Sequence, residues 1–102
     1  MDKMTETPFN DLCPAEVERL AILAEECAEV IQIVGKILRH GYKSTHPDNE
    51  DGPNNREMLE GEIGHVLNAI KRMDESLDIL ASNAKKEQRR KAVKIEKYLH
   101  HQ

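Results

Sequence analysis

Four side chains with metal-ligating chemistry occur as two pairs, and the members of each pair are three positions apart. Glu26 and Glu29 form the first pair, and Glu62 and His65 form the second. If both segments are helical, the two members of each pair project from the same helix face. Oxygen-rich groups from two neighbouring helices suit Mg²⁺, whose shell is completed by water and phosphate. The spacing therefore predicts a divalent-cation site between two helices.

The glutamates of both pairs lie on apolar helix faces. At 100° per residue, Glu26 and Glu29 are about 60° apart, among isoleucine and valine residues of the same segment. Glu62 falls inside the apolar arc of the second segment, and His65 lies at its edge. Burial of an unpaired carboxylate costs several kcal/mol or more, so each needs a basic partner, a proton or a metal. Ion pairs with the basic C-terminal segment are the alternative to a metal site.

Helical spacing accounts for most of the chain, and end signals place the first helix. Pro14 suits the first helical position and Gly41 suits a left-handed cap, which predicts a helix over 14–40. Its main apolar stripe runs from Val17 to Leu38 in steps of three and four residues, and we expect this stripe to face the core.

Turn-forming residues separate three predicted helices. The segment 41–55 is rich in Pro, Gly, Asn and Asp and is predicted to be a long loop. Asn54 and Glu57 resemble a capping box at the start of a helix over 55–73. A third helix is predicted over 77–99. With no strand-like alternation, the fold class is all-α, a three-helix antiparallel chain with a flexible N-terminal arm over 1–12 and a helical domain over 13–102.

Length and composition favour association of the chain with itself. The chain has 102 residues, of which 33% are charged and only 3% aromatic. A chain of this size buries only about 60–70% of its unfolded surface, and few bulky side chains are present to anchor a monomeric core. The first helix is also apolar on two sides. We therefore expect a four-helix-bundle-type homo-oligomer, either a homodimer or a homotetramer.

The apolar run lengths and the cysteine count argue against several protein classes. No apolar run reaches the roughly 18 residues of a membrane span, and the first residues lack a signal-peptide core. Two cysteines do not make a disulfide framework. We expect a cytoplasmic protein with no membrane association.

Charge is distributed unevenly along the chain. Residues 85–97 carry a net charge of +5 and the remainder −9, which gives the overall −4. A basic segment on an acidic body favours contact with phosphate, although a solvated helix face has the same pattern. The pI of 5.7 makes nucleic acid an improbable partner.

The motif residues resemble a known enzyme family. Glu25-Glu26-Cys27-Ala28-Glu29 forms an E-E-x-x-E motif, and Glu62-Ile63-Gly64-His65 stands where an E-x-x-D motif would follow. Together with LAEECAEVIQIVGKILRHGY, NREMLEGEIGHVLNAI and KYLHHQ, these motifs look like MazG-like all-α nucleoside triphosphate pyrophosphohydrolases, in particular the small single-domain, phage-type members. The resemblance covers the chain from about Leu20.

This resemblance implies an activity and a role for each motif residue. The family hydrolyses a nucleoside triphosphate to the monophosphate and pyrophosphate, with Mg²⁺ held by the motif acids. By resemblance, Glu26, Glu29 and Glu62 are metal ligands, with His65 at the fourth ligand position. Glu25 and Glu26 are the candidate catalytic residues, and Glu25 is the candidate general base. The residues implied to contact substrate are Lys36, Asn83, Lys86, Arg89 and Arg90.

The chain departs from the family pattern at two places. His65 replaces an aspartate, and imidazole suits Mn²⁺, Fe²⁺ or Zn²⁺ better than Mg²⁺. Mg²⁺ is thus the expected cofactor, with Mn²⁺ as the alternative. The span between Glu29 and Glu62 is also long for the family, because the loop over 41–55 intervenes.

Two other functions fit the same residues. Glu62-x-x-His65 is the E-x-x-H motif of ferritin-like di-iron bundles. A catalytically degenerate module that binds nucleotide or nucleic acid through the basic segment is the second alternative, although the few aromatic residues argue against base stacking.

Overall fold

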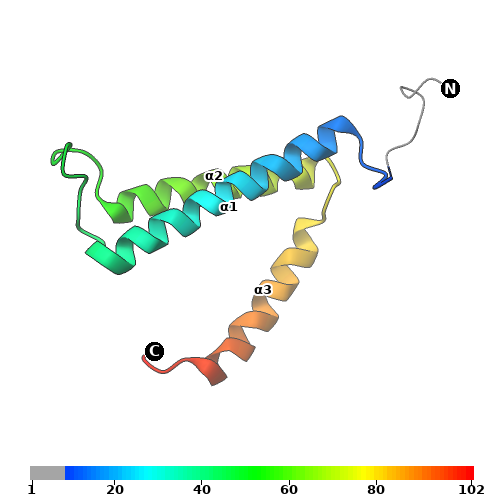
Figure 1. Cartoon of the computed structure of the whole chain (residues 1–102). Helices are drawn as coiled ribbons and strands as arrows, with labels where there is room; N and C mark the ends of the chain where they lie inside the picture. The colour runs from blue at the N-terminus through cyan, green and yellow to red at the C-terminus, as the bar shows by residue number, and fades with distance from the viewer. Residues whose placement is uncertain (1–8) are drawn as a thin grey trace.

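The computed structural model describes residues 9–102, which fold as helices and turns without a β-strand. Helix α1 spans Pro14–His40, α2 spans Asn55–Glu75 and α3 spans Ala81–Ile95, followed by a 3-10 turn over Glu96–Tyr98. Helices α1 and α2 lie side by side and antiparallel, as a hairpin closed by the loop (Figure 1). The all-α class is confirmed. Of the predicted N-terminal arm, residues 1–8 lie outside the described part.

Local signals set the bounds of α1, which match the prediction. Pro14 occupies the first turn, and the backbone N–H of Cys13 donates to Glu16 Oε1 at 2.8 Å. At the other end Gly41 has a φ of 85°, where a side chain would be strained, and its N–H donates to the Ile37 carbonyl at 2.7 Å. Helix α1 therefore begins and ends where its sequence requires.

Helix α2 begins with the predicted capping box. The Glu57 N–H donates to Asn54 Oδ1 at 2.9 Å, and the Asn54 N–H donates to Glu57 Oε1 at 3.1 Å. This reciprocal pair satisfies two of the backbone donors that a helix start leaves free. The helix continues to Glu75, two residues beyond the predicted end at 73.

The predicted start of the third helix at residue 77 is wrong, because α3 begins four residues later at Ala81. Leu77 has a φ of 61°, which ends helical geometry there. Asp78 accepts two hydrogen bonds from the Arg19 guanidinium, at 2.6 and 2.9 Å. The Ala81 N–H donates to Asp74 Oδ1 at 2.7 Å. These contacts hold the segment between the helices as a turn, which helical spacing alone did not reveal.

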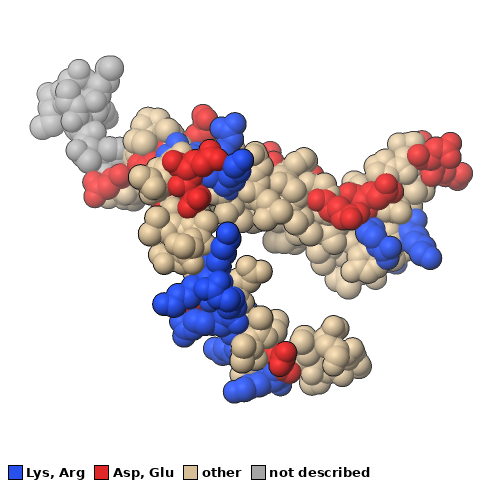
Figure 2. All heavy atoms as spheres, turned by 180° about the vertical axis from the view of Figure 1, so that it is seen from behind, with Lys and Arg blue, Asp and Glu red and all other residues tan. Residues whose placement is uncertain are grey.

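Helix α3 leaves the hairpin instead of packing antiparallel along it (Figure 1). It contacts the end of α2, lies beyond contact distance of α1, and has no buried residue. The expected three-helix antiparallel packing is therefore corrected to a two-helix hairpin with a projecting third helix. Lys and Arg side chains gather on this helix (Figure 2).

The buried face of α1 is the one that carries the acidic pair. The buried apolar residues are Ile33 on α1 and Ala69 and Met73 on α2. The stripe from Val17 to Leu38, expected to face the core, is largely exposed; Leu38, for example, is 82% exposed. The opposite face carries larger isoleucine side chains, which fill the space against α2 better than the alanines and Gly35 of the stripe.

The loop over 41–54 folds back onto the end of the hairpin. The side chain of Asn55, which is buried, donates to the Gly41 carbonyl at 3.1 Å. The Asn55 N–H donates to the Ser44 carbonyl at 2.9 Å, and the Arg56 N–H to the Tyr42 carbonyl at 3.0 Å. The loop thus shields the first turn of α2. Among the described helices, none combines the length and the apolar character needed to cross a membrane.

Candidate metal centre

The two predicted ligand pairs meet in the middle of the hairpin. Glu26 and Glu29 lie on α1, and Glu62 and His65 lie on α2. Each offers one ligand atom, and these four atoms all lie within 4.8 Å of one another. The i, i+3 spacing presents each pair on one helix face, and the antiparallel packing places the two faces opposite each other. The predicted convergence of these four side chains is therefore present in the structure.

His65 contacts acids from both helices. Its Nδ1 lies 3.3 Å from Glu62 Oε2 on the same helix and 3.4 Å from Glu26 Oε2 on α1. The imidazole is 61% exposed, whereas the side chains of Glu26 and Glu62 are 23% and 19% exposed. The carboxylates of the cluster are therefore largely shielded from solvent, whereas the imidazole at its rim is accessible.

One oxygen of Glu26 lacks a hydrogen-bond donor. Glu26 Oε2 is fully removed from solvent and accepts no hydrogen bond within the described chain. The 3.4 Å approach of His65 Nδ1 is long for a charge-assisted hydrogen bond, which is about 2.7–2.9 Å. A shielded carboxylate oxygen without a donor is unfavourable. A cation at the shared point of the cluster would satisfy it.

Neighbouring acids alter the titration of Glu62. Its pKa is raised above the ordinary value, chiefly by a hydrogen bond with the Glu29 carboxyl group, then by loss of solvation. Glu26 acts in the same direction, whereas the hydrogen bond with His65 lowers the pKa. The shift reflects three carboxylates crowded into one place, since crowding favours the neutral form of one of them.

The donor set of the cluster fits a divalent cation. Three carboxylates and one imidazole supply oxygen and nitrogen ligands, and no Lys or Arg is paired with these acids among the described residues. Ion pairing with the basic segment, the alternative to a metal, is therefore absent from the described chain. Carboxylates suit Mg²⁺ and Mn²⁺, and the imidazole shifts the preference towards Mn²⁺ or Fe²⁺.

Glu25 lies outside the cluster. Its side chain is exposed on α1 and is not among the converging ligand groups. Lys36 is also exposed, two helical turns beyond Glu29, where it lines a cavity at the loop end of the hairpin. Neither residue contributes a ligand atom to the four-residue cluster, although both belong to the helix that carries the first ligand pair.

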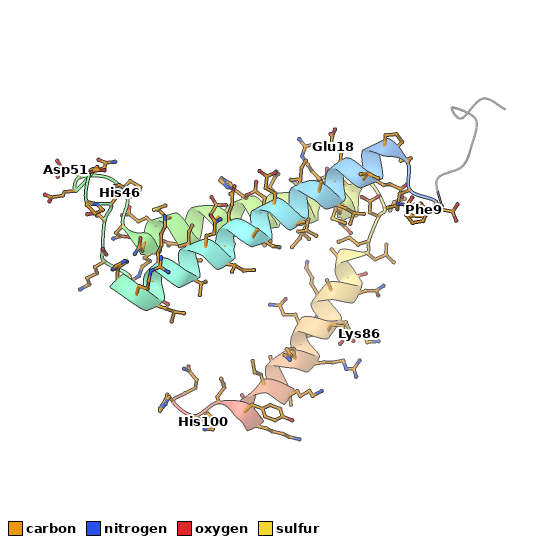
Figure 3. All side chains as sticks on the ribbon, viewed as in Figure 1. Phe9, Glu18, His46, Asp51, Lys86 and His100 are labelled. Atoms are coloured by element: carbon orange, nitrogen blue, oxygen red, sulfur yellow. The ribbon has the colours of Figure 1, made fainter. Side chains whose placement is uncertain are left out.

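The other predicted substrate-contacting residues lie on α3 and are exposed (Figure 3). Arg90 pairs with Glu87 of the same helix, Nη1 to Oε1, at 2.7 Å. Because α3 leaves the hairpin, these residues are not brought to the cluster of the same chain. They are Asn83, Lys86, Arg89 and Arg90.

Sequence reasoning missed two features at the ends of the hairpin. Arg19 and Asp78 are 59 positions apart, so no local spacing predicted their bidentate ion pair. The loop residues Ser44 to His46 line the cavity that contains Lys36. The closure of the loop onto α2 brings them there, and the only sequence signal was the length of the loop.

No protein-family model matches this chain, and neither a curated protein nor a solved structure matches it. The donor set and its surroundings are therefore the observations that bear on its chemistry.

Proposed function

We propose that the chain is a divalent-metal-dependent hydrolase that converts a nucleoside triphosphate to the monophosphate and pyrophosphate. The observation that carries the proposal is the meeting of Glu26, Glu29, Glu62 and His65 within 4.8 Å, with one buried Glu26 oxygen that accepts no hydrogen bond among the described residues. The likeness of the E-E-x-x-E and E-x-x-H segments to MazG-like enzymes, of the small phage type, supplies the reaction.

The four cluster residues have the task of binding the cation. A divalent ion bound there supplies charge neutralisation on the phosphates and lowers the pKa of bound water. Mg²⁺ is the proposed cofactor, and Mn²⁺ is an alternative because His65 contributes nitrogen. Glu25, exposed one position before the first ligand, is the proposed proton acceptor for the attacking water at the rim of the cluster.

The triphosphate also needs positive charge from the protein. Hydrolysis of a phosphoanhydride depends on positioning and on stabilising charge on the leaving phosphates. Lys36 lies on α1, the helix that carries the first ligand pair. It is the residue of the same chain that we propose to stabilise charge on the leaving phosphates. The basic residues of α3 project away from their own hairpin, so we assign them to the site of a neighbouring copy.

We also propose a homo-oligomer, dimer or tetramer, and the exposed apolar face of the hairpin supports it. Ile31 is 71% exposed and Leu67 is 61% exposed, and they lie on the side opposite the metal cluster. An apolar cavity of about 350 Å³ lies on this side, and Cys27, Ile63 and Val66 also line it. Only three apolar residues of the described chain are buried. Two hairpins packed through this face would form the expected four-helix bundle in the cytoplasm.

The test is a hydrolysis screen with matched variants. Each ribo- and deoxyribonucleoside triphosphate is incubated with Mg²⁺ or Mn²⁺, and monophosphate and pyrophosphate are quantified. Glu29→Gln is expected to abolish turnover, since it removes a ligand, whereas Glu60→Gln, at an exposed position of α2, is expected to retain it. No turnover of any nucleotide with either metal would refute the proposed activity.

The contact between Glu62 and His65 supports a second candidate function. Their 3.3 Å approach beside two further carboxylates gives a donor set that also suits a di-iron site of the ferritin type. Ferrous iron oxidation without nucleotide hydrolysis would favour that function. Nucleotide binding without turnover would instead identify a degenerate member of the hydrolase family.

A further inference from the structure

We propose that the cavity at the loop end of the hairpin binds a phosphate group. The cavity has a volume of about 200 Å³ and lies between the last turns of α1, the loop and the first turn of α2. This volume is below the roughly 300–1,000 Å³ that encloses a drug-sized ligand. The cavity is therefore suited to a small anion or to one end of a larger ligand.

The side chains around the cavity carry positive charge and hydrogen-bond donors. Lys36, Arg39 and His40 come from α1. His46 comes from the loop (Figure 3). Among the described residues, no Asp or Glu lines the cavity, and neither Lys36 nor Arg39 takes part in an ion pair. Beside the apolar Pro47 and Met58, the charges of Lys36 and Arg39 favour an anion in this cavity.

The loop orients His46 as a donor. The Asp48 backbone N–H donates to His46 Nδ1 at 3.1 Å, so Nδ1 carries a lone pair and the proton of the neutral ring is on Nε2. The Asp48 carboxylate also approaches Nδ1, at 3.9 Å. Thr45 also lines the cavity and adds a hydroxyl group.

Compensation of the helix dipole accounts for only part of this charge. Arg39 and His40 lie in the last turn of α1, where cations stabilise the helix end. Lys36 is a turn earlier, so its charge is not explained in that way. The first-turn N–H groups of Asn55 and Arg56 are already bonded to loop carbonyls. The attraction for an anion therefore comes from side chains and not from the helix start.

The cavity lies further along the hairpin from the metal cluster. On α1 Lys36 follows Glu29 by seven residues, which places it about 10 Å further along the same face. On α2 Met58, which lines the cavity, precedes Glu62 by one turn, about 6 Å. A ligand with several phosphates can thus reach both places. The link to nucleotide hydrolysis rests on the proposed function, whereas phosphate binding itself does not.

Calorimetric titration with inorganic pyrophosphate, in buffer with chelator and without divalent metal, tests the proposal. The double variant Lys36→Gln/Arg39→Gln is expected to weaken binding roughly tenfold or more. The control Lys71→Gln/Arg72→Gln changes the net charge equally at exposed positions near the far end of α2 and is expected to bind as the wild type does. Lys36→Gln alone, at an exposed side chain without an ion pair, is expected to give part of the loss with unchanged thermal stability.

Two further arms separate this site from the metal centre and identify the source of the phosphate. Glu26→Gln/Glu29→Gln is expected to keep or strengthen pyrophosphate binding, even if hydrolysis is absent in every protein. Adenosine monophosphate in place of pyrophosphate shows whether the cavity takes a nucleoside phosphate or the leaving group. Equal affinity in the wild type and the Lys36/Arg39 variant, binding only with metal, or no binding of either probe would overturn the proposal.

Discussion

Replacement of Glu26 by Gln is expected to change thermal stability in opposite directions with and without a divalent cation. Without metal, the variant relieves repulsion among carboxylates whose ligand atoms lie within 4.8 Å. Two like charges at that separation repel by about 3.5 kcal/mol at an effective dielectric constant of about 20. The Glu26 side chain is 23% exposed, and screening reduces the gain to about 1 kcal/mol. That corresponds to roughly 4–8 °C for a small domain.

With metal present, the same substitution removes a ligand. A cation that binds only the folded chain, at about 100 times its dissociation constant, stabilises the fold by about 2.7 kcal/mol. The melting temperature of the wild type should then rise by roughly 10–20 °C. The variant should lose most of this rise, because Glu26 Oε2 would no longer be available as a buried anionic ligand.

Thermal melts followed by circular dichroism, in chelator and in millimolar MnCl₂ at one protein concentration, measure both effects. Glu60→Gln is the matched control, because it removes one carboxylate from an exposed position of the same hairpin. Its response to Mn²⁺ should equal that of the wild type. If Glu26→Gln melts at or below the wild type in chelator and retains the full Mn²⁺ response, the cluster does not gather around a cation.

Substitutions at four further positions test the fourth ligand, an ion pair, the exposed apolar face and a helix cap. His65→Asp should increase Mg²⁺-supported hydrolysis in the nucleotide screen, since Mg²⁺ prefers oxygen ligands; an equal or lower rate would show that the imidazole is not a substituted ligand. The Arg19 guanidinium lowers the pKa of Asp78, so the ion pair stabilises the fold above about pH 4 and loses this effect as the pH falls through the lowered pKa. The stability difference between wild type and Asp78→Asn, from urea unfolding, should therefore be constant above that pH and shrink below it. Ile31→Glu should yield monomers in size-exclusion chromatography with light scattering, because it places charge on the exposed apolar face; an unchanged mass would remove this face as the interface. Asn54→Ala should lower stability by about 1 kcal/mol through loss of the cap, and Asn54→Ser should restore most of it.

Local sequence signals determined the helix ends whose caps involve close neighbours. Pro14 and Gly41 bound α1, and the Asn54–Glu57 capping box starts α2, as predicted. Each of these signals acts within four residues, so it can be recognised without knowing what the helix packs against. The i, i+3 spacing likewise placed each metal-ligand pair on one face of its own helix.

Contacts between residues far apart in the chain decided the remaining features. The pairing of Arg19 with Asp78 across 59 positions helps to hold the turn before α3, which begins at Ala81. The choice between the two apolar faces of α1 depended on which one fits against Ala69 and Met73. A periodic pattern shows that a face is apolar, but only a packed neighbour decides which apolar face is buried.

The candidate site combines both kinds of information. Spacing predicted that Glu26 with Glu29, and Glu62 with His65, would each act as a pair. Their meeting depends on the register between α1 and α2, which the loop closure at Asn55 and the packing of Ile33 set together. The projection of α3 also separated its basic residues from the cluster of their own chain. Residue types and local spacing therefore determined the chemistry that is available, and helix packing decided which groups share one place, because side chains converge only when their backbones are held together.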